Sequence, residues 1–173
     1  MEIHIQAYFK KEKEGALLFI LVGSIAILGS LTALYFFPSS FLVRGAATAL
    51  IAIGLLQVGL GLNIFLRTDK QSKNLLQQLS KNPIQYYSEE TNRMDKVMSN
   101  FKIIRKVELV LILLGLVFAL MGSLGQMGHF IIGTGLGLCV QSVCSLLIDL
   151  SAEWRAGLYF YHLQKEGKQL QNS

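Results

Sequence analysis

Residues 109–148 read LVLILLGLVFALMGSLGQMGHFIIGTGLGLCVQSVCSLLI, forty consecutive positions without Asp, Glu, Lys or Arg. An α-helix rises about 1.5 Å per residue, so about 20 apolar residues cross the hydrocarbon layer of a membrane. The stretch is long enough for two crossings, and Gly125–His129 in its middle supplies the turn between them. The sequence therefore predicts membrane helices over 107–126 and 130–149.

Two shorter uncharged stretches precede this one, Gly15–Phe37 with 23 residues and Gly45–Leu66 with 22. Each has the length of one crossing, which predicts membrane helices over 15–37 and 42–66. Pro38-Ser39-Ser40 forms the turn between them. No small-x-small cleavage pattern follows the first stretch, which indicates a retained helix rather than a cleaved signal peptide.

The composition agrees with a membrane protein. Hydrophobic residues make up 52% of the chain and charged residues 16%, whereas about 25% of the residues in soluble domains are charged. The predicted fold class is an all-α integral membrane protein with four transmembrane helices in two hairpins. At 173 residues the chain is long enough for one such domain.

The positions of the basic residues predict the orientation. Fifteen of the 16 Lys and Arg residues precede the first predicted helix, follow the fourth, or lie between the second and third. Arg44, at the start of the second helix, is the exception. Because basic residues are retained in the cytoplasm, both termini and the central linker are predicted to be cytoplasmic. The net charge of +5 is thus explained by orientation, and no nucleic-acid partner is expected.

Three segments lie outside the predicted membrane helices. Residues 1–14 are expected to form a short interfacial helix, and residues 151–173 an amphipathic tail at the membrane surface. The linker 67–106 is expected to extend the second and third helices into a cytoplasmic helical hairpin. Its tip is placed near 82–88, with Ser88 as the N-cap of the returning helix.

An apolar stripe follows this tip at helical spacing. Its members are Met94, Val97, Met98, Phe101 and Ile104. The favoured interpretation is that the stripe packs on the other arm of the hairpin; the alternative is that it binds a partner protein. On the second interpretation, Met94, Met98 and Phe101 are candidates to face that partner.

The two halves of the chain follow a similar plan, which suggests an internal repeat. Glu14 leads the first helix and Glu108 the third. The segment 57–62, QVGLGL, aligns without gaps on 141–146, QSVCSL. A duplication of this kind would be parallel, with its twofold axis along the membrane normal. With so few identities it is a hypothesis.

Small and polar residues recur at a spacing of about four on the predicted helices. Such residues let membrane helices approach closely, either within one chain or between two chains. The predicted packing positions are Gly45, Ala49, Gln57, Gly61, Asn63, Gly133, Gly137, Gln141 and Ser145.

Gln57 and Gln141 fall near the middle of their helices, where an unpaired amide facing lipid is costly. Both are expected to face inward, where they can hydrogen-bond to each other. The favoured role is structural; the alternative is a polar point in a transport path. Asn63, one turn from the inner surface, is expected to cap the packing seam.

Asp149 and Glu153 lie four residues apart at the inner end of the fourth helix. Ion pairs with basic residues of the linker are favoured over a cation site, because no histidine lies nearby. Both are also candidates to face a partner. No metal ion and no cofactor are expected.

The sequence carries no metal-binding His-Glu-x-x-His pattern, phosphate-binding loop or nucleophile-elbow motif, so no enzymatic activity is expected. The favoured function is a non-enzymatic membrane interaction protein that binds another membrane protein or itself. An immunity or accessory protein for a membrane-inserting partner would be one example. The alternatives are a small oligomeric channel or carrier with Gln57 and Gln141 on its path, and a protein that binds membrane lipids. The expected location is a cell membrane, by default the bacterial cytoplasmic membrane.

Overall fold

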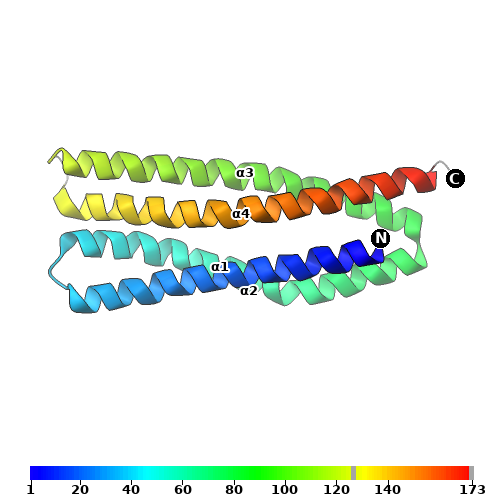
Figure 1. Cartoon of the computed structure of the whole chain (residues 1–173), viewed down its shortest axis with the longest axis horizontal. Helices are drawn as coiled ribbons and strands as arrows, with labels where there is room; N and C mark the ends of the chain where they lie inside the picture. The colour runs from blue at the N-terminus through cyan, green and yellow to red at the C-terminus, as the bar shows by residue number, and fades with distance from the viewer. Residues whose placement is uncertain (126–127, 172–173) are drawn as a thin grey trace.

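A computed structural model describes residues 1–125 and 128–171 as four long helices (Figure 1). Their bounds are α1 (Glu2–Phe36), α2 (Phe41–Lys81), α3 (Pro83–Ser123) and α4 (Gly128–Gln171). α1 packs along α2 and α3 packs along α4, and α2 and α4 form the main contact between these two pairs. The connections are so short that consecutive helices run in opposite directions.

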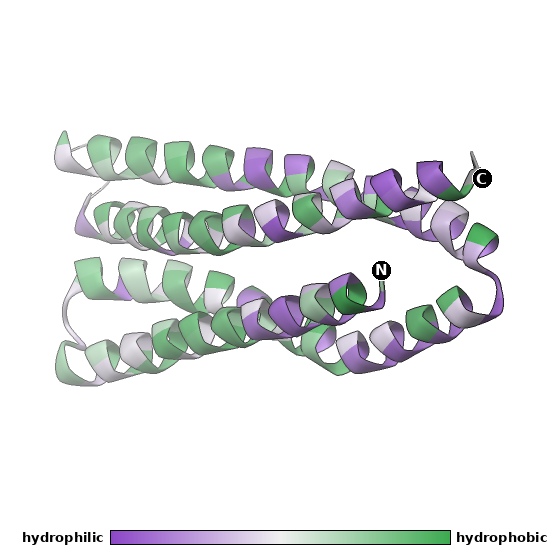
Figure 2. Ribbon diagram, turned by 45° about the vertical axis from the view of Figure 1, so that its right-hand side comes forward, coloured by the Kyte–Doolittle hydropathy of each residue, from purple (hydrophilic) through white to green (hydrophobic). Residues whose placement is uncertain are grey.

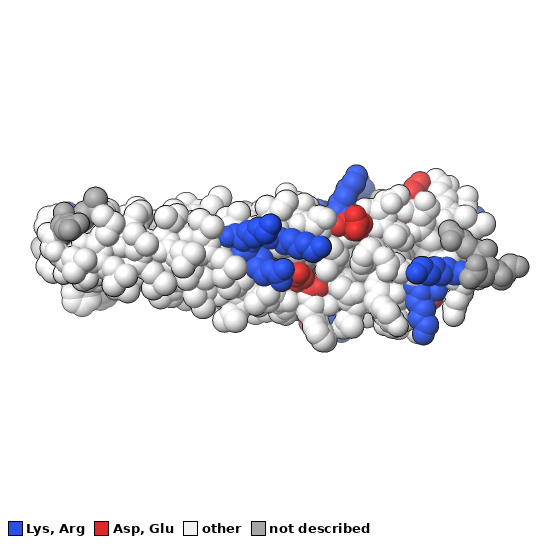
Figure 3. Space-filling view, turned by 90° about the horizontal axis from the view of Figure 1, so that it is seen from above, with Lys and Arg blue, Asp and Glu red and all other residues white. Residues whose placement is uncertain are grey.

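The molecule is a rod with two different halves. The α1–α2 turn lies at one end, as do the last residues of α3 and the first of α4; both termini and the α2–α3 junction lie toward the other end (Figure 1). Figure 2 shows that hydrophobic residues dominate the half that contains the α1–α2 turn. Figure 3 shows that charged side chains gather over the half that contains the two termini. We call residues 15–66 and 109–148 the apolar half and the remaining described residues the charged half.

The apolar half exposes large hydrophobic side chains around its circumference. Leu21, Leu55, Leu113 and Leu147 are each more than half exposed. Contiguous apolar surface of this extent is rare on soluble monomers. Three helices, α1, α2 and α4, are long and apolar enough to cross a membrane. In α3, Glu108 limits the uncharged part of the helix to 109–123. The structure thus indicates a membrane protein.

Local sequence signals explain where the helices begin and end. Pro38 follows α1, and the Ser40 side chain caps α2 by accepting a hydrogen bond from the amide of Val43 at 3.4 Å. Asn82 ends α2 and caps α3, where its side chain accepts from the amide of Gln85 at 3.2 Å. Pro83 is the first residue of α3, a position at which its missing N–H costs nothing. The predicted N-cap at Ser88 is wrong, because this residue lies inside α3.

The terminal segments differ from their prediction. Residues 1–14 are not a separate interfacial helix, because α1 is continuous from Glu2. Residues 151–171 are likewise the continuation of α4 rather than a separate tail. Three parts of the prediction lie outside the described residues. They are the end of the third helix at 126, residues 126–127 in the middle of the turn 125–129, and residues 172–173 of the tail.

A hydrophobic core inside the charged half holds the first part of α1 and the last part of α4. It contains residues from all four helices: Ile5, Tyr8, Phe9, Leu75, Tyr86, Tyr87, Met94, Ala156, Tyr159 and Leu163. Its presence explains why α2 and α3 do not form the predicted two-helix hairpin. The two arms diverge from their junction, and α1 and α4 occupy the space between them (Figures 1 and 2).

Candidate binding site

Glycines bring the two helix pairs into backbone contact. A methyl group added to Gly45 on α2 would overlap the carbonyl oxygen of Phe130 on α4, and one on Gly133 would overlap that of Leu42. A methyl group on Gly137 would lie 2.6 Å from the carbonyl oxygen of Ala46. The predicted packing positions on α2 and α4 are therefore used for contact within the chain.

The same device joins the helices within each pair. A methyl group on Gly61 would lie 2.8 Å from the Ala16 carbonyl oxygen, and one on Gly115 2.7 Å from that of Gly135. Ala49 is also buried in the α2–α4 region, whereas Asn63 is exposed. The expectation that Asn63 caps a seam is wrong, because two helical steps of about 100° carry it to the face opposite Gly61.

The two central amides meet between α2 and α4. Gln141 Nε2 donates to Gln57 Oε1, and Gln57 Nε2 donates to Ser145 Oγ at 2.6 Å. Ser145 in turn donates to the backbone carbonyl of Gln141 at 3.1 Å. All three side chains are buried. This closed network leaves neither amide directed at an open path.

The contacts between α2 and α4 reveal a local twofold symmetry. The reciprocal contacts equate Leu42 with Phe130 and Gly45 with Gly133, two pairs separated by 88 residues. Gln57 and Ser145 have the same separation. The structure therefore supports an internal repeat, but in a register one helical turn away from the alignment of Gln57 with Gln141.

A cavity of about 290 Å³ lies near this symmetry axis, at the boundary of the two halves. All four helices line it, and three pairs of lining residues on α2 and α4 are again 88 apart. These pairs are Leu60 with Ile148, Ile64 with Ala152, and Arg67 with Arg155. The apolar members face the apolar half, and the two arginines belong to the charged half.

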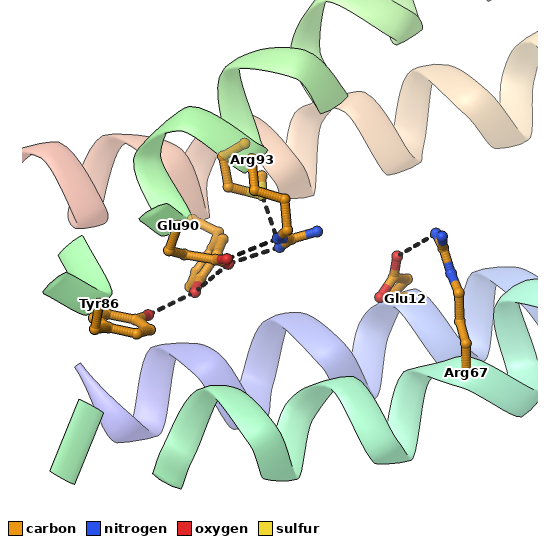
Figure 4. Close-up of polar contacts among 7 residues, drawn as sticks. Glu12, Arg67, Tyr86, Glu90 and Arg93 are labelled. Carbon is orange, nitrogen blue, oxygen red and sulfur yellow. Dashed lines mark hydrogen bonds and ion pairs between the residues drawn. The ribbon is translucent and has the colours of Figure 1, made fainter. Parts of the chain in front are cut away.

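Glu12 of α1 lines this cavity together with the two arginines. Its Oε1 lies 3.8 Å from Arg67 Nη2, while its buried Oε2 has no hydrogen-bond partner among the described residues (Figure 4). Burial raises the pKa of Glu12, and the positive charge of Arg67 only partly offsets that effect. Arg155 donates to Ser151 and packs its guanidinium on Gly15. The cavity thus contains an incompletely satisfied carboxylate.

The acidic pair of α4 is divided between two partners. Glu153 accepts from Arg105 Nη1 at 3.1 Å, which is an ion pair with a linker residue as the sequence predicts. Asp149 lines the cavity and interacts with Glu108, whose Oε2 is buried without a hydrogen bond to any described residue. Among the described residues, no group of three His, Cys, Asp or Glu is placed to hold a metal ion.

A buried polar network lies further along the charged half (Figure 4). Glu90, 1% exposed, accepts two hydrogen bonds from Arg93, each at 2.7 Å, and one from the Tyr159 hydroxyl at 3.0 Å. The Tyr86 and Tyr159 hydroxyls are 2.9 Å apart. Burial by itself lowers the pKa of Arg93. The hydrogen bonds to Glu90 and the negative charge of Glu90 outweigh that effect and raise the arginine pKa. Burial also raises the pKa of Tyr159, and Glu90 raises it further.

Comparison of the chain with protein-family models, curated proteins and solved structures finds no match. The site is therefore interpreted from its own geometry.

The predicted partner-facing stripe of α3 is largely turned inward. Met94 is fully buried in the hydrophobic core of the charged half, so its assignment as partner-facing is wrong. Met98 and Phe101 are partly buried against the same core, and Phe101 also lines the cavity. The stripe packs in a four-helix core, because α1 and α4 cover the surface that a two-helix hairpin would have left open.

The amide network offers a direct test of its structural role. In Gln57→Leu, the Gln141 amide loses its buried partner, so we expect a loss of about 1–3 kcal/mol in the free energy of unfolding. The double variant Gln57→Leu/Gln141→Leu removes both partners and should recover part of this loss. Asn63→Leu, an exposed amide on the same helix, is the control and should change little. Unfolding in mixed micelles measures all three, and a neutral Gln57→Leu would contradict the structural role.

Proposed function

We propose that this chain is a four-span membrane protein that acts by binding rather than by catalysis. In this proposal its two termini and the α2–α3 junction are cytoplasmic. The observation that carries the proposal is the division of the rod into an apolar half and a charged half, with the boundary at about the same level in all four helices. α4 contributes 21 residues from Gly128 to Ile148, about 31 Å at 1.5 Å per residue. This matches the hydrocarbon thickness of about 30 Å.

The packing of α3 supports its role as the fourth span. Its uncharged part is short, but it lies along the apolar part of α4, with Gly115 against Gly135. Because α3 and α4 are in backbone contact at this level, the membrane that surrounds the apolar part of α4 also surrounds this part of α3. Glu108 and Asp149 then lie together at the inner boundary of the membrane, and Glu108 is buried there beside Asp149.

The geometry favours binding over transport. The small-residue seams are occupied within the chain, and Gln57 and Gln141 bond to each other. A membrane-protein partner or a second copy would therefore have to use the outer helix faces. The cavity between Arg67 and Arg155 has both polar and apolar walls and lies at the boundary of the two halves. We place the binding function there.

Cysteine labelling tests the topology. In a background with Cys139→Ala and Cys144→Ala, single cysteines replace the exposed residues Ser39 and Ser80. A membrane-impermeant maleimide should label Ser39→Cys in intact cells and Ser80→Cys only after permeabilisation. The opposite pattern, or equal labelling from outside, would refute the proposed orientation. Liposome flux is the test of transport, and we expect no flux above that of protein-free vesicles.

A further inference from the structure

We propose that the cavity binds the headgroup of a phospholipid that carries both a phosphate and a primary ammonium group. The inference rests on the proposed function, because the orientation places the cavity at the inner leaflet. The supporting features are a balanced set of charges, an orphan acceptor, an apolar wall and an opening toward lipid.

The charges that line the cavity suit a zwitterion better than a simple anion. Two arginines, Arg67 and Arg155, face two acidic residues, Glu12 and Asp149. Guanidinium groups hydrogen-bond phosphate oxygens. The Arg67 contact with Glu12 is long at 3.8 Å, so this guanidinium is available to a phosphate.

Glu12 supplies the second recognition element. Its Oε2 is buried and accepts no hydrogen bond from the part of the chain that the structure describes, and such orphan acceptors are costly. An ammonium group with N–H donors would satisfy this oxygen and pair with its charge. A quaternary ammonium group lacks N–H donors and would leave the oxygen unsatisfied. The site therefore distinguishes a primary ammonium from a choline headgroup.

The walls of the cavity continue into the apolar half. Phe19, Leu60, Ile64 and Ile148 form this part of the lining. Such a surface suits the glycerol backbone and the first methylenes of acyl chains, whereas a free phosphate compound gains nothing from it. A volume of about 290 Å³ accommodates a headgroup but not a whole lipid, so the chains must leave the cavity.

The exposed lining residues show where the chains would leave. They are Leu60 and Arg67 of α2 and Asn100 and Ile104 of α3, whereas the lining residues of α1 and α4 are buried or half-buried. The opening therefore lies between α2 and α3, the neighbouring helices that touch least. In the proposed orientation this gap faces the inner leaflet.

The test uses the full chain in detergent and short-chain lipids with dihexanoyl tails. The melting temperature is followed against the concentration of phosphatidylethanolamine, phosphatidylglycerol or phosphatidylcholine, since a ligand that binds the folded state raises it. We expect a saturable shift with phosphatidylethanolamine at lower concentration than with the other two. Equal shifts with phosphatidylcholine would overturn the inference. Equal shifts with phosphoethanolamine, which has no tails, would also overturn it and assign the site to a free zwitterion.

Variants assign the binding to the cavity. Loss of charge-assisted hydrogen bonds in Arg67→Gln/Arg155→Gln should weaken phosphatidylethanolamine binding at least about tenfold. Glu12→Gln should remove its preference over phosphatidylglycerol, and Ile64→Trp should block binding while both arginines remain. Lys70→Gln removes an exposed charge of α2 that does not line the cavity and is the control. Unchanged binding in the double variant would overturn the inference.

Failure of this inference and failure of the proposed function are distinguishable. If cysteine labelling gives the proposed sides but no lipid shifts the melting temperature, only the lipid assignment fails. If labelling gives the opposite sides, the proposed function fails whatever the lipid result.

Discussion

Gly133→Ala is expected to destabilise the folded protein by about 3 kcal/mol or more, at the upper end of the usual cost of overpacking. The added methyl group would overlap the carbonyl oxygen of Leu42 and lie 2.9 Å from the amide nitrogen of Ala46. Both obstacles are backbone atoms of α2, so no side-chain rotation relieves the overlap. α2 and α4 would have to separate, which would also pull Gln57 away from Gln141 and Ser145.

The opposite sign is expected at a glycine that touches nothing. A methyl group on Gly59, also on α2, would meet no atom within 4 Å. Alanine is intrinsically better than glycine in a helix by about 1 kcal/mol, so Gly59→Ala should be neutral or slightly stabilising. Unfolding in mixed micelles and the fraction of monodisperse protein after purification measure both variants. Similar effects at the two sites would show that α2 and α4 do not meet at Gly133.

The apolar half was largely predictable because its physics is local. An uncharged run of a given length indicates a crossing, and a glycine every fourth residue indicates a face that another helix approaches closely. The sequence therefore predicted Gly45 and Gly133 as packing positions. It did not give their register, because short apolar repeats align in more than one way. The reciprocal backbone contacts of Gly45 with Phe130 and of Gly133 with Leu42 fix the 88-residue separation that the alignment missed by one turn.

The charged half was less predictable because its core is made of contacts far apart in the sequence. Ile5, Met94 and Leu163 are buried together, yet each belongs to a segment that resembles an amphipathic surface helix on its own. An N-cap at Ser88, as the sequence predicts, would place Glu90 in the first turn of its helix. The approach of α4 brings Tyr159 to Glu90, which also accepts from Arg93 on its own helix. The spacing of Glu90 and Arg93 was a signal, but an exposed pair would have the same spacing.

The cavity was missed for a related reason. Arg67 and Arg155 were counted as markers of orientation, and Glu12 as part of a short interfacial helix. Their common role depends on the twofold relation between α2 and α4, which places the arginines on equivalent turns. The lesson concerns the segments next to a membrane span. Arg67 and Arg155 fit the positive-inside rule and also line the cavity, and only the packing shows the second property.

The network around Glu90 leads to the second large effect. Glu90→Leu leaves the partly buried Arg93 guanidinium without its two hydrogen bonds and the Tyr159 hydroxyl without its acceptor. Removing one partner of a buried ion pair typically costs about 3–5 kcal/mol, because the other charge stays desolvated. Since Arg93 is 28% exposed on its side chain, we expect a value near the lower end, about 3 kcal/mol. Hydrogen exchange should increase in the part of α3 and α4 around Tyr86 and Leu163, while the apolar half stays protected.

A double variant separates the cost of an orphaned charge from the loss of the pair itself. Glu90→Leu/Arg93→Met replaces both partners with apolar side chains, and such replacements are often neutral or stabilising. It should therefore recover most of the stability lost in Glu90→Leu. Glu89→Leu removes a neighbouring but exposed carboxylate that accepts from Gln85, so it should have little effect and is the matched control. If the double variant is as unstable as the single one, the network stabilises this half through Glu90 and Tyr159 rather than through compensation of Arg93. If Glu89→Leu and Glu90→Leu behave alike, Glu90 is not buried between α3 and α4, and the four-helix core of the charged half is wrong.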